Sequence, residues 1–209
     1  MFLRSLFTLI LTVAMISPAF AEGSGVYGGI KFIDSYQTNW GGGRYDGTES
    51  QNSVGLGAFI GYDMYASSDT PIRVDIEYAF RSAFKGESNE TFAGQHIQTK
   101  LEYNLHTLLA NAYYDFHNDS IFTPYVGGGL GIGMVDGYAE LNGNGNQAND
   151  TVFAWQVGGG VGVALTDALT ADLGYRYLGT STVHSEVDNN KFKTDISSHE
   201  FSVGIRFGF

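Results

Sequence analysis

The chain has 209 residues and is rich in glycine (29), phenylalanine (15) and tyrosine (13), with three prolines and no cysteine. This balance favours short twisted strands over helices, and the missing cysteines exclude disulfides and thiolate metal sites. The formal net charge of −11 argues against nucleic acid and anionic membrane surfaces as partners.

The first 21 residues have the features of an export signal. Arg4 supplies a positive charge, residues 6–16 are apolar but too few to span a bilayer, and residues 18–21 end in a small-x-small cleavage pattern. We therefore expect residues 1–21 to be removed as a signal peptide and residues 22–209 to form one domain outside the cytoplasm. An uncleaved anchor is the alternative. No later stretch approaches the ~20 consecutive apolar residues of a transmembrane helix.

Eight segments of the mature chain alternate apolar with polar or small residues, which predicts β-strands. In the last segment, Phe201, Val203 and Ile205 fall on one face of the strand, whereas Ser202 and Arg206 fall on the other. In the third, Ile72, Val74, Ile76, Tyr78 and Phe80 oppose Arg73, Asp75, Glu77 and Arg81. The expected strands span residues 25–33, 53–65, 71–81, 103–116, 122–135, 151–165, 169–178 and 197–209.

The connections between these segments alternate in length. The short ones are 66–70, 117–121 and 166–168, and the long ones are 34–52, 82–102, 136–150 and 179–196. Because outer-membrane barrels have short turns on one side and long loops on the other, we expect an eight-stranded antiparallel up-and-down transmembrane β-barrel in the cell outer membrane. A soluble β-sandwich shows the same alternation of residues. The loop asymmetry, the export signal and the terminal Phe209 favour the barrel.

Several segments resemble a known family. Residues 111–116, 124–133, 174–177 and the closing strand are similar to the opacity-type and OmpA-like surface barrels of Gram-negative bacteria, over essentially the whole mature chain. The resemblance implies a role as an adhesin, a structural protein or a surface antigen, and no shared catalytic residue. It also implies that Phe209, as a terminal aromatic, forms part of the signal that the barrel assembly machinery recognises.

Charged residues occupy the face that would point into such a barrel. Buried charges are costly unless they are paired, and an eight-stranded barrel leaves room only for side chains. We therefore expect a structural network of ion pairs in the lumen, and a narrow ion path is the alternative. The predicted members are Lys31, Asp63, Arg73, Asp75, Glu77, Arg81, Asp115, Asp172, Arg176 and Arg206.

Two glycine runs, residues 127–131 and 158–162, resemble phosphate-binding loops only superficially. Neither is followed by a helical pattern or by Lys-Ser or Lys-Thr. We expect both runs to lie inside strands, where glycine leaves room for inward-facing arginine and tyrosine side chains.

Residues suited to catalysis or metal binding are present but badly spaced. His184-Ser185-Glu186 and His199-Glu200 supply the residue types of a hydrolytic site, but neighbours on an extended chain point to opposite sides. We therefore expect no enzyme and no cofactor. We also expect no metal site, because no histidine pair has ligand spacing among His96, His106, His117, His184 and His199.

The sequence thus predicts a small, monomeric outer-membrane surface protein that displays four long loops for adhesion or surface interaction. Its expected partners are outer-membrane lipid, the barrel assembly machinery, and host or environmental ligands that the loops contact. A structural envelope protein without a specific partner and a narrow porin-like pore are the alternatives. Aromatic loop residues are candidate contacts, although those near strand ends could instead form an outer aromatic girdle. They are Tyr36, Trp40, Tyr45, Phe84, Phe92, Tyr138 and Phe192.

Overall fold

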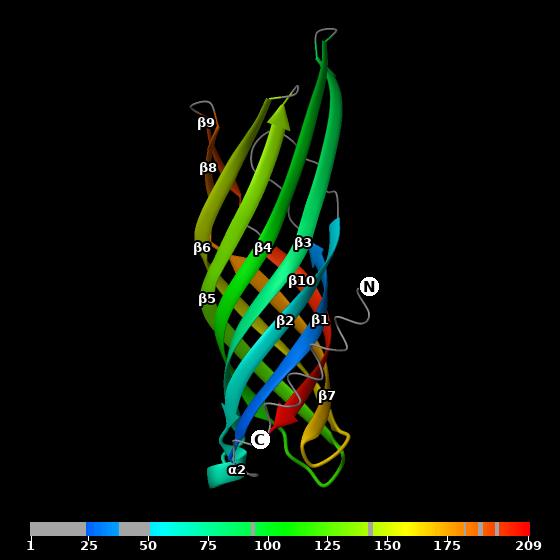
Figure 1. The fold of residues 1–209 in the computed structure, drawn as a ribbon, viewed down its shortest axis with the longest axis vertical. Helices are drawn as coiled ribbons and strands as arrows, with labels where there is room; N and C mark the ends of the chain where they lie inside the picture. The colour runs from blue at the N-terminus through cyan, green and yellow to red at the C-terminus, as the bar shows by residue number, and fades with distance from the viewer. Residues whose placement is uncertain are drawn as a thin grey trace.

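The computed structural model describes residues 24–37, 51–92, 95–141, 144–181, 183–187, 190–194 and 197–209. Within these ranges, eight antiparallel strands form a closed barrel in which each strand pairs with its neighbours in sequence and β10 pairs with β1 (Figure 1). The barrel strands are β1 (Val26–Gln37), β2 (Gln51–Asp63), β3 (Ile72–Phe92), β4 (Gln95–Asp115), β5 (Phe122–Leu141), β6 (Asn144–Ala164), β7 (Leu169–Thr180) and β10 (Ser197–Gly208). The predicted eight-stranded up-and-down barrel is therefore confirmed.

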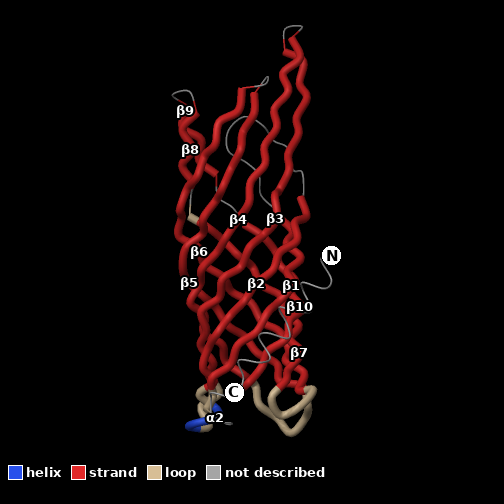
Figure 2. The backbone as a smooth tube through the Cα atoms, in the orientation of Figure 1, coloured by secondary structure: helices blue, strands red, loops and turns tan. Residues whose placement is uncertain are grey.

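Closure of the barrel brings the two ends of the described chain together. The backbone N–H of Phe209 donates to the carbonyl of Val26, and that of Ser24 donates to the carbonyl of Phe209. A path that starts at Tyr27 and passes from each residue to its partner on the next strand returns to β1 at Gln37. The two ends of this path are staggered by ten residues along β1. Such a stagger requires steeply tilted strands, which cross at a large angle on opposite walls in Figure 2.

The two faces of the strands differ as the period-two pattern predicts. On β3 the apolar Ile76 is 58% exposed on the outside of the barrel, whereas the adjacent Glu77 is 0% exposed on the inside. The same alternation continues along β3, with Ile72 and Phe80 outside and Arg73 buried inside. The barrel is therefore apolar outside and charged within, the reverse of a soluble protein.

All four predicted long loops contain strand residues, which is a correction to the sequence prediction, and in the first of them β1 extends to Gln37 and β2 begins at Gln51. The pairing of β3 with β4 continues to Phe92 opposite Gln95, and the pairing of β5 with β6 continues to Leu141 opposite Asn144. A separate hairpin, β8 (Val183–Val187) with β9 (Asn190–Thr194), occupies most of the fourth loop. Residues 85–91 and 144–150 include no large apolar residue, so their sequence lacks the alternation that marks a half-buried strand. In the first long loop, residues 38–50 lie outside the described ranges.

The short connections lie at the opposite end of the barrel, beside the C-terminus and the start of β1 (Figure 1). One of them contains a single helical turn, α2 (Tyr65–Ser68), so the prediction that Tyr65 belongs to the preceding strand is wrong. The side chain of Asp63 accepts the N–H of Tyr65 at 2.9 Å, and Asp69 ends the turn with a φ of 51°. Across the described ranges, no helix has the length and apolar character needed to cross a membrane.

Glycines on the inner wall make room for large neighbours, as predicted. A Cβ at Gly129 would overlap Oδ1 of Asn111, and one at Gly158 would lie 2.7 Å from Cβ of Arg176. The lumen can therefore hold long polar side chains only because these wall positions carry no side chain.

Candidate functional site

The charged network of the lumen has Glu200 at its outer end. Both carboxylate oxygens of Glu200 are bound by Arg81, from Nε at 2.5 Å and from Nη2 at 2.9 Å. Arg176 Nε donates to the same carboxylate at 2.6 Å, and the hydroxyls of Ser35 and Ser198 donate to it at 3.1 and 3.3 Å. Glu200 has no exposed surface, so two guanidinium groups offset the cost of burying its charge.

Arg176 links this carboxylate to a second one. Its Nη1 donates to Oε1 of Glu77 at 2.7 Å, while Nζ of Lys31 lies 2.5 Å from the other oxygen of Glu77. The same Nη1 donates to Oε1 of Gln156 at 2.6 Å. Side chains from β1, β3, β6, β7 and β10 therefore meet in one continuous network.

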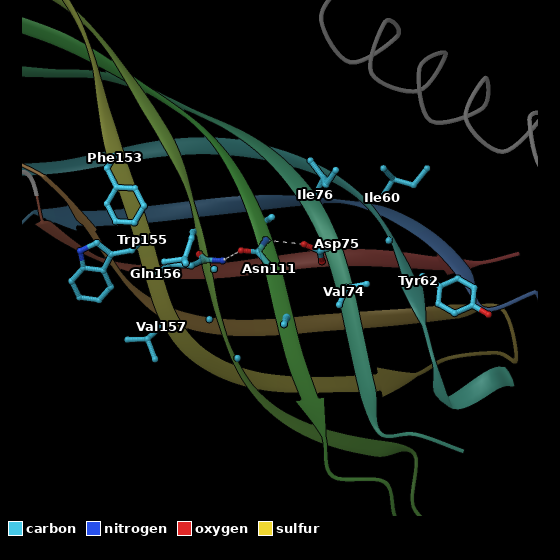
Figure 3. A pocket seen from close by; sticks show the side chains of 17 residues that line it. Ile60, Tyr62, Val74, Asp75, Ile76, Asn111, Phe153, Trp155, Gln156 and Val157 are labelled. Carbon is cyan, nitrogen blue, oxygen red and sulfur yellow. Dashed lines mark hydrogen bonds between the residues drawn. The ribbon is translucent and has the colours of Figure 1, made fainter. Parts of the chain in front are cut away.

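A chain of amides extends the network across the lumen. The Gln156 amide donates to Oδ1 of Asn111 at 2.6 Å, and the Asn111 amide donates to Oδ1 of Asp75 at 2.7 Å (Figure 3). The hydroxyl of Tyr27 donates to the other Asp75 oxygen at 3.1 Å. Asp75 is thus held by two neutral donors and not by an arginine.

A second group of charges lies near the end of the barrel where Ser24 is hydrogen-bonded to Phe209. Arg73 binds Asp115 through two hydrogen bonds of 2.5 and 2.9 Å, and the Tyr125 hydroxyl donates to Asp172 at 2.7 Å. The Arg206 guanidinium lies over the Tyr27 ring at 5.7 Å. Pairing through two parallel bonds makes Arg73 with Asp115 the geometrically strongest pair of this group.

The structure places nine of the ten predicted lumen residues inside the barrel, and the exception is Asp63. It lies where β2 ends, is partly exposed, and binds the backbone of Tyr65, so its assignment to the network is wrong. The sequence analysis missed Glu200, although it lies on the same inward parity as Ser202 and Arg206. With Glu200 in place of Asp63, the described lumen still balances five cations against five anions.

Part of the lumen is apolar, which the sequence analysis did not predict. One buried cluster lines the wall formed by β4 to β7, and its members are Leu105, Leu109, Val135, Ala154 and Leu178. Each is at most 8% exposed. Charged and apolar side chains together therefore pack the barrel interior, as expected for the width of eight strands.

The candidate loop contacts are only partly described. Tyr36 lies on the outward face of β1, 41% exposed and opposite His199 in the register, which agrees with the alternative of an aromatic girdle. Trp40 and Tyr45 lie outside the described residues. The other four candidates have their backbones in strands: Phe84 and Phe92 in β3, Tyr138 in β5 and Phe192 in β9.

The residues considered for catalysis are separated by the strands that carry them. His199 is on the outside of β10, where its Nδ1 is 2.5 Å from the Tyr175 hydroxyl, whereas Glu200 is buried inside. On β8, the backbone of His184 pairs with Lys193 and that of Ser185 pairs with Phe192.

The histidines considered as metal ligands are dispersed. His106 is on the outside of β4 near Asp136, and His117 stacks on Tyr65 at the opposite end of the barrel, with ring centroids 3.8 Å apart. His96 pairs with Thr91 in the projecting hairpin of β3 and β4. In the part of the chain that the structure describes, no three His, Cys, Asp or Glu residues form a group that could hold a metal ion.

Comparisons with known proteins agree with this architecture. A family model described as "Outer membrane protein beta-barrel domain" matches residues 7–209. The outer membrane protein PagN of Salmonella typhimurium is 34% identical over 85 residues, which is 39% of this chain and 36% of the length of PagN.

Two solved structures share the fold at low sequence identity. Neisserial surface protein A is 22% identical with a TM-score of 0.60, and the match covers 89% of this chain and 98% of that protein. Ail, the attachment invasion locus protein of Yersinia pestis, is 15% identical with a TM-score of 0.51, covering 88% and 99%. A fold match at this identity establishes the architecture and transfers no binding residue.

Proposed function

Because this chain belongs to the outer membrane protein beta-barrel domain family, we propose that its barrel anchors a set of hairpins that carry out adhesion or another surface contact. The protein is an outer-membrane β-barrel, and its apolar exterior faces the hydrocarbon of that membrane. The proposal concerns the outer end of the barrel, where the strands extend beyond the apolar belt.

The length of β3 to β6 carries the proposal. Each of these strands has 20 or 21 residues, about twice the ~9–11 that a tilted strand needs to cross a bilayer. Among the described side chains of β3, the exposed apolar series reaches Phe80, and the strand continues for twelve more residues to Phe92. Figure 1 shows the hairpins of β3 with β4 and of β5 with β6 extending at the end of the barrel opposite the C-terminus. In our proposal these two hairpins project from the membrane. Such elements present a large surface on a rigid base.

The named relatives are consistent with this role without assigning it. Ail is named for attachment and invasion, and its barrel resembles this one in fold. PagN aligns over a limited stretch and is described as an outer membrane protein. Adhesion by this chain is our proposal, and it rests on the projecting hairpins and not on a transferred binding residue.

We also propose that the barrel acts as a scaffold and neither catalyses a reaction nor conducts ions. The paired charges around Glu77 and Glu200 and the buried cluster around Leu105 support a packed interior. In the same proposal, residues 1–21 are removed on export, the protein is a monomer, and Phe209 contributes to recognition by the barrel assembly machinery. The hydrogen bonds of Phe209 to Ser24 and Val26 support its importance for closure.

The register allows the hairpins to be removed without shifting a strand. Replacing residues 85–102 with Asn-Gly keeps Phe84 opposite Tyr103, and replacing residues 137–148 with Asn-Gly keeps Asp136 opposite Asn149. Asn-Gly favours the two-residue turn that joins antiparallel strands. Each shortened variant serves as the matched control for the other, because both retain the complete membrane-spanning barrel.

Each protein is displayed on the surface of bacteria. The test measures how strongly these bacteria adhere to cultured host cells and to immobilised matrix proteins. We expect the wild-type protein to raise adhesion above that of empty bacteria, and the doubly shortened variant to lose this gain while still reaching the surface. Equal adhesion by the wild-type and doubly shortened proteins would place binding elsewhere. No gain from the wild-type protein would favour a structural envelope role.

A further inference from the structure

The outside of the barrel carries an open apolar groove over β4 and β5, with a volume of about 1070 Å³. The lowest part of its floor is made of small residues, because Ala110 and Ala112 are the outward side chains of β4 and Gly128 is an outward position of β5, whereas the next outward residue of β5 is the large Leu130. Figure 3 shows large side chains standing on either side of this floor. They are Ile60, Val74 and Ile76 on one side and Phe153, Trp155 and Val157 on the other.

The register explains why the groove is hollow. In one row across the barrel wall, Val74 pairs with Ala112, Ala112 with Gly128, and Gly128 with Val157. The small residues Ala112 and Gly128 thus separate the larger Val74 and Val157. In the next row Ile76 pairs with Ala110, Ala110 with Leu130, and Leu130 with Trp155, so the low floor continues along β4 and Leu130 bounds it on β5. A run of small outward positions between bulky neighbours leaves a trough in an otherwise convex surface.

The surroundings of the groove determine what can occupy it. It lies within the outward apolar face that an outer-membrane barrel turns toward hydrocarbon, and none of its described outward-facing side chains is charged. The nearest charged group, Asp75, points to the lumen beneath the floor and is bound by Asn111 (Figure 3). A charged or strongly polar occupant would therefore lose hydration without gaining a partner in the groove.

Shape distinguishes between the two apolar occupants that a membrane offers. A second copy of the barrel has a convex wall, which would rest on Val74, Leu130 and Val157 around the floor and leave Ala112 and Gly128 without contact. A lipid acyl chain is slender and flexible enough to reach Ala110 and Ala112. We infer that this groove holds one acyl chain of an outer-membrane lipid, more tightly than the convex parts of the barrel hold theirs.

The reason for tighter binding is packing, since all apolar groups in a membrane are already out of water. Association in a membrane depends on van der Waals contact. The atoms that line an unfilled groove lack such contacts on their open side. A chain that lies in the groove touches a floor and two walls, whereas a chain on a convex surface touches one side only. This inference depends on the membrane-facing exterior and is independent of the proposed adhesion.

Filling the floor tests the inference. Ala112→Leu and Ala110→Leu place a bulky side chain where the acyl chain would lie, and Ala171→Leu makes the same change on the outward face of β7, where Ala171 pairs with Val163 and Ile205. Each protein is extracted from outer membranes into a mild detergent and examined by native mass spectrometry. We expect one retained lipid on the wild-type protein and on Ala171→Leu, and a roughly tenfold lower retained fraction on the floor variants.

A second measurement places the lipid in the groove itself. Trp155 lines the groove, and Trp40→Phe removes the other tryptophan of the chain, so Trp155 becomes the sole reporter. The proteins are folded in vesicles of a phospholipid with brominated acyl chains and then diluted into a mild detergent free of bromine. Retained lipid should continue to quench Trp155 in the parent protein and in Ala171→Leu, whereas fluorescence should recover fully in Ala112→Leu.

Three results would overturn the inference. They are equal lipid retention by all variants, complete recovery of Trp155 fluorescence in the parent protein, and a wild-type dimer that dissociates when the floor is filled. The last result would assign the groove to a second copy of the chain. A gel shift on boiling, measured for every variant, shows that the barrel has folded in each comparison.

Discussion

Arg81 on β3 and Glu200 on β10 form an ion pair inside the barrel through two hydrogen bonds, of 2.5 and 2.9 Å. The two residues are 119 positions apart in sequence, and their strands are not neighbours in the sheet. The pair therefore connects two parts of the wall directly across the lumen. Because both side chains are fully buried, each depends on the other to offset the loss of hydration.

Glu200→Gln tests this dependence. The substitution keeps the shape of the side chain but leaves Arg81 without a carboxylate and removes one of the two that Arg176 binds. We expect the free energy of unfolding to fall by about 3 kcal/mol, the scale of a broken buried pair. Urea unfolding in lipid vesicles, followed by tryptophan fluorescence, measures it. Asp63→Asn is the control and should change the urea midpoint little, because Asp63 lies outside the network. Equal midpoints for the wild-type protein and both variants would show that the network contributes little stability.

Gly129→Ala tests the packing of the inner wall. A methyl group at this position would overlap the Asn111 side chain, which connects Gln156 to Asp75. We expect a loss of about 1–3 kcal/mol in the same unfolding measurement, the usual cost of overpacking. Gly208→Ala is the matched control, since no atom lies within 4 Å of a Cβ built there. If the two variants unfold at the same urea concentration, the wall has more room than these contacts indicate.

The closing strand is predicted to have two separable roles. Deleting residues 203–209 removes much of the β10 segment that pairs with β1, so the barrel should fail to close and to enter the outer membrane. Phe209→Ala keeps most of that pairing and should fold in detergent, with a gel shift on boiling, but accumulate more slowly in the outer membrane of cells. Normal membrane insertion of the deletion variant, measured by fractionation, would contradict the role of β10 in closure.

The fold followed from the sequence because the membrane imposes a simple pattern. On β3 a large apolar residue alternates with a charged or small one from Ile72 to Arg81, and this pattern gives both the strand and its faces. The same pattern is missing from residues 85–91 of β3 and 144–150 of β6, which include no large apolar residue. The pairing of these segments is visible only from the register.

The lumen could be predicted only in part. Asp63 was assigned inward by parity, but the strand ends there and its side chain turns to the backbone of Tyr65. Glu200 has the parity of Arg206, yet it was considered only with His199, so its inward position was overlooked. Leu105 and Leu109 face the lumen while Leu108 faces outward, and a strand apolar on both faces gives no signal to separate them.

Single-channel recording in planar bilayers tests the central claim, that the barrel is a packed scaffold and not a conduit. The paired charges around Glu77 and Glu200 and the buried cluster around Leu105 leave no reason to expect a water-filled path through eight strands. The wild-type protein, inserted and shown by protease protection to be folded, should give no steady conductance at any applied voltage that the bilayer tolerates. Reproducible open steps from that protein would contradict the scaffold and make a narrow pore the better account.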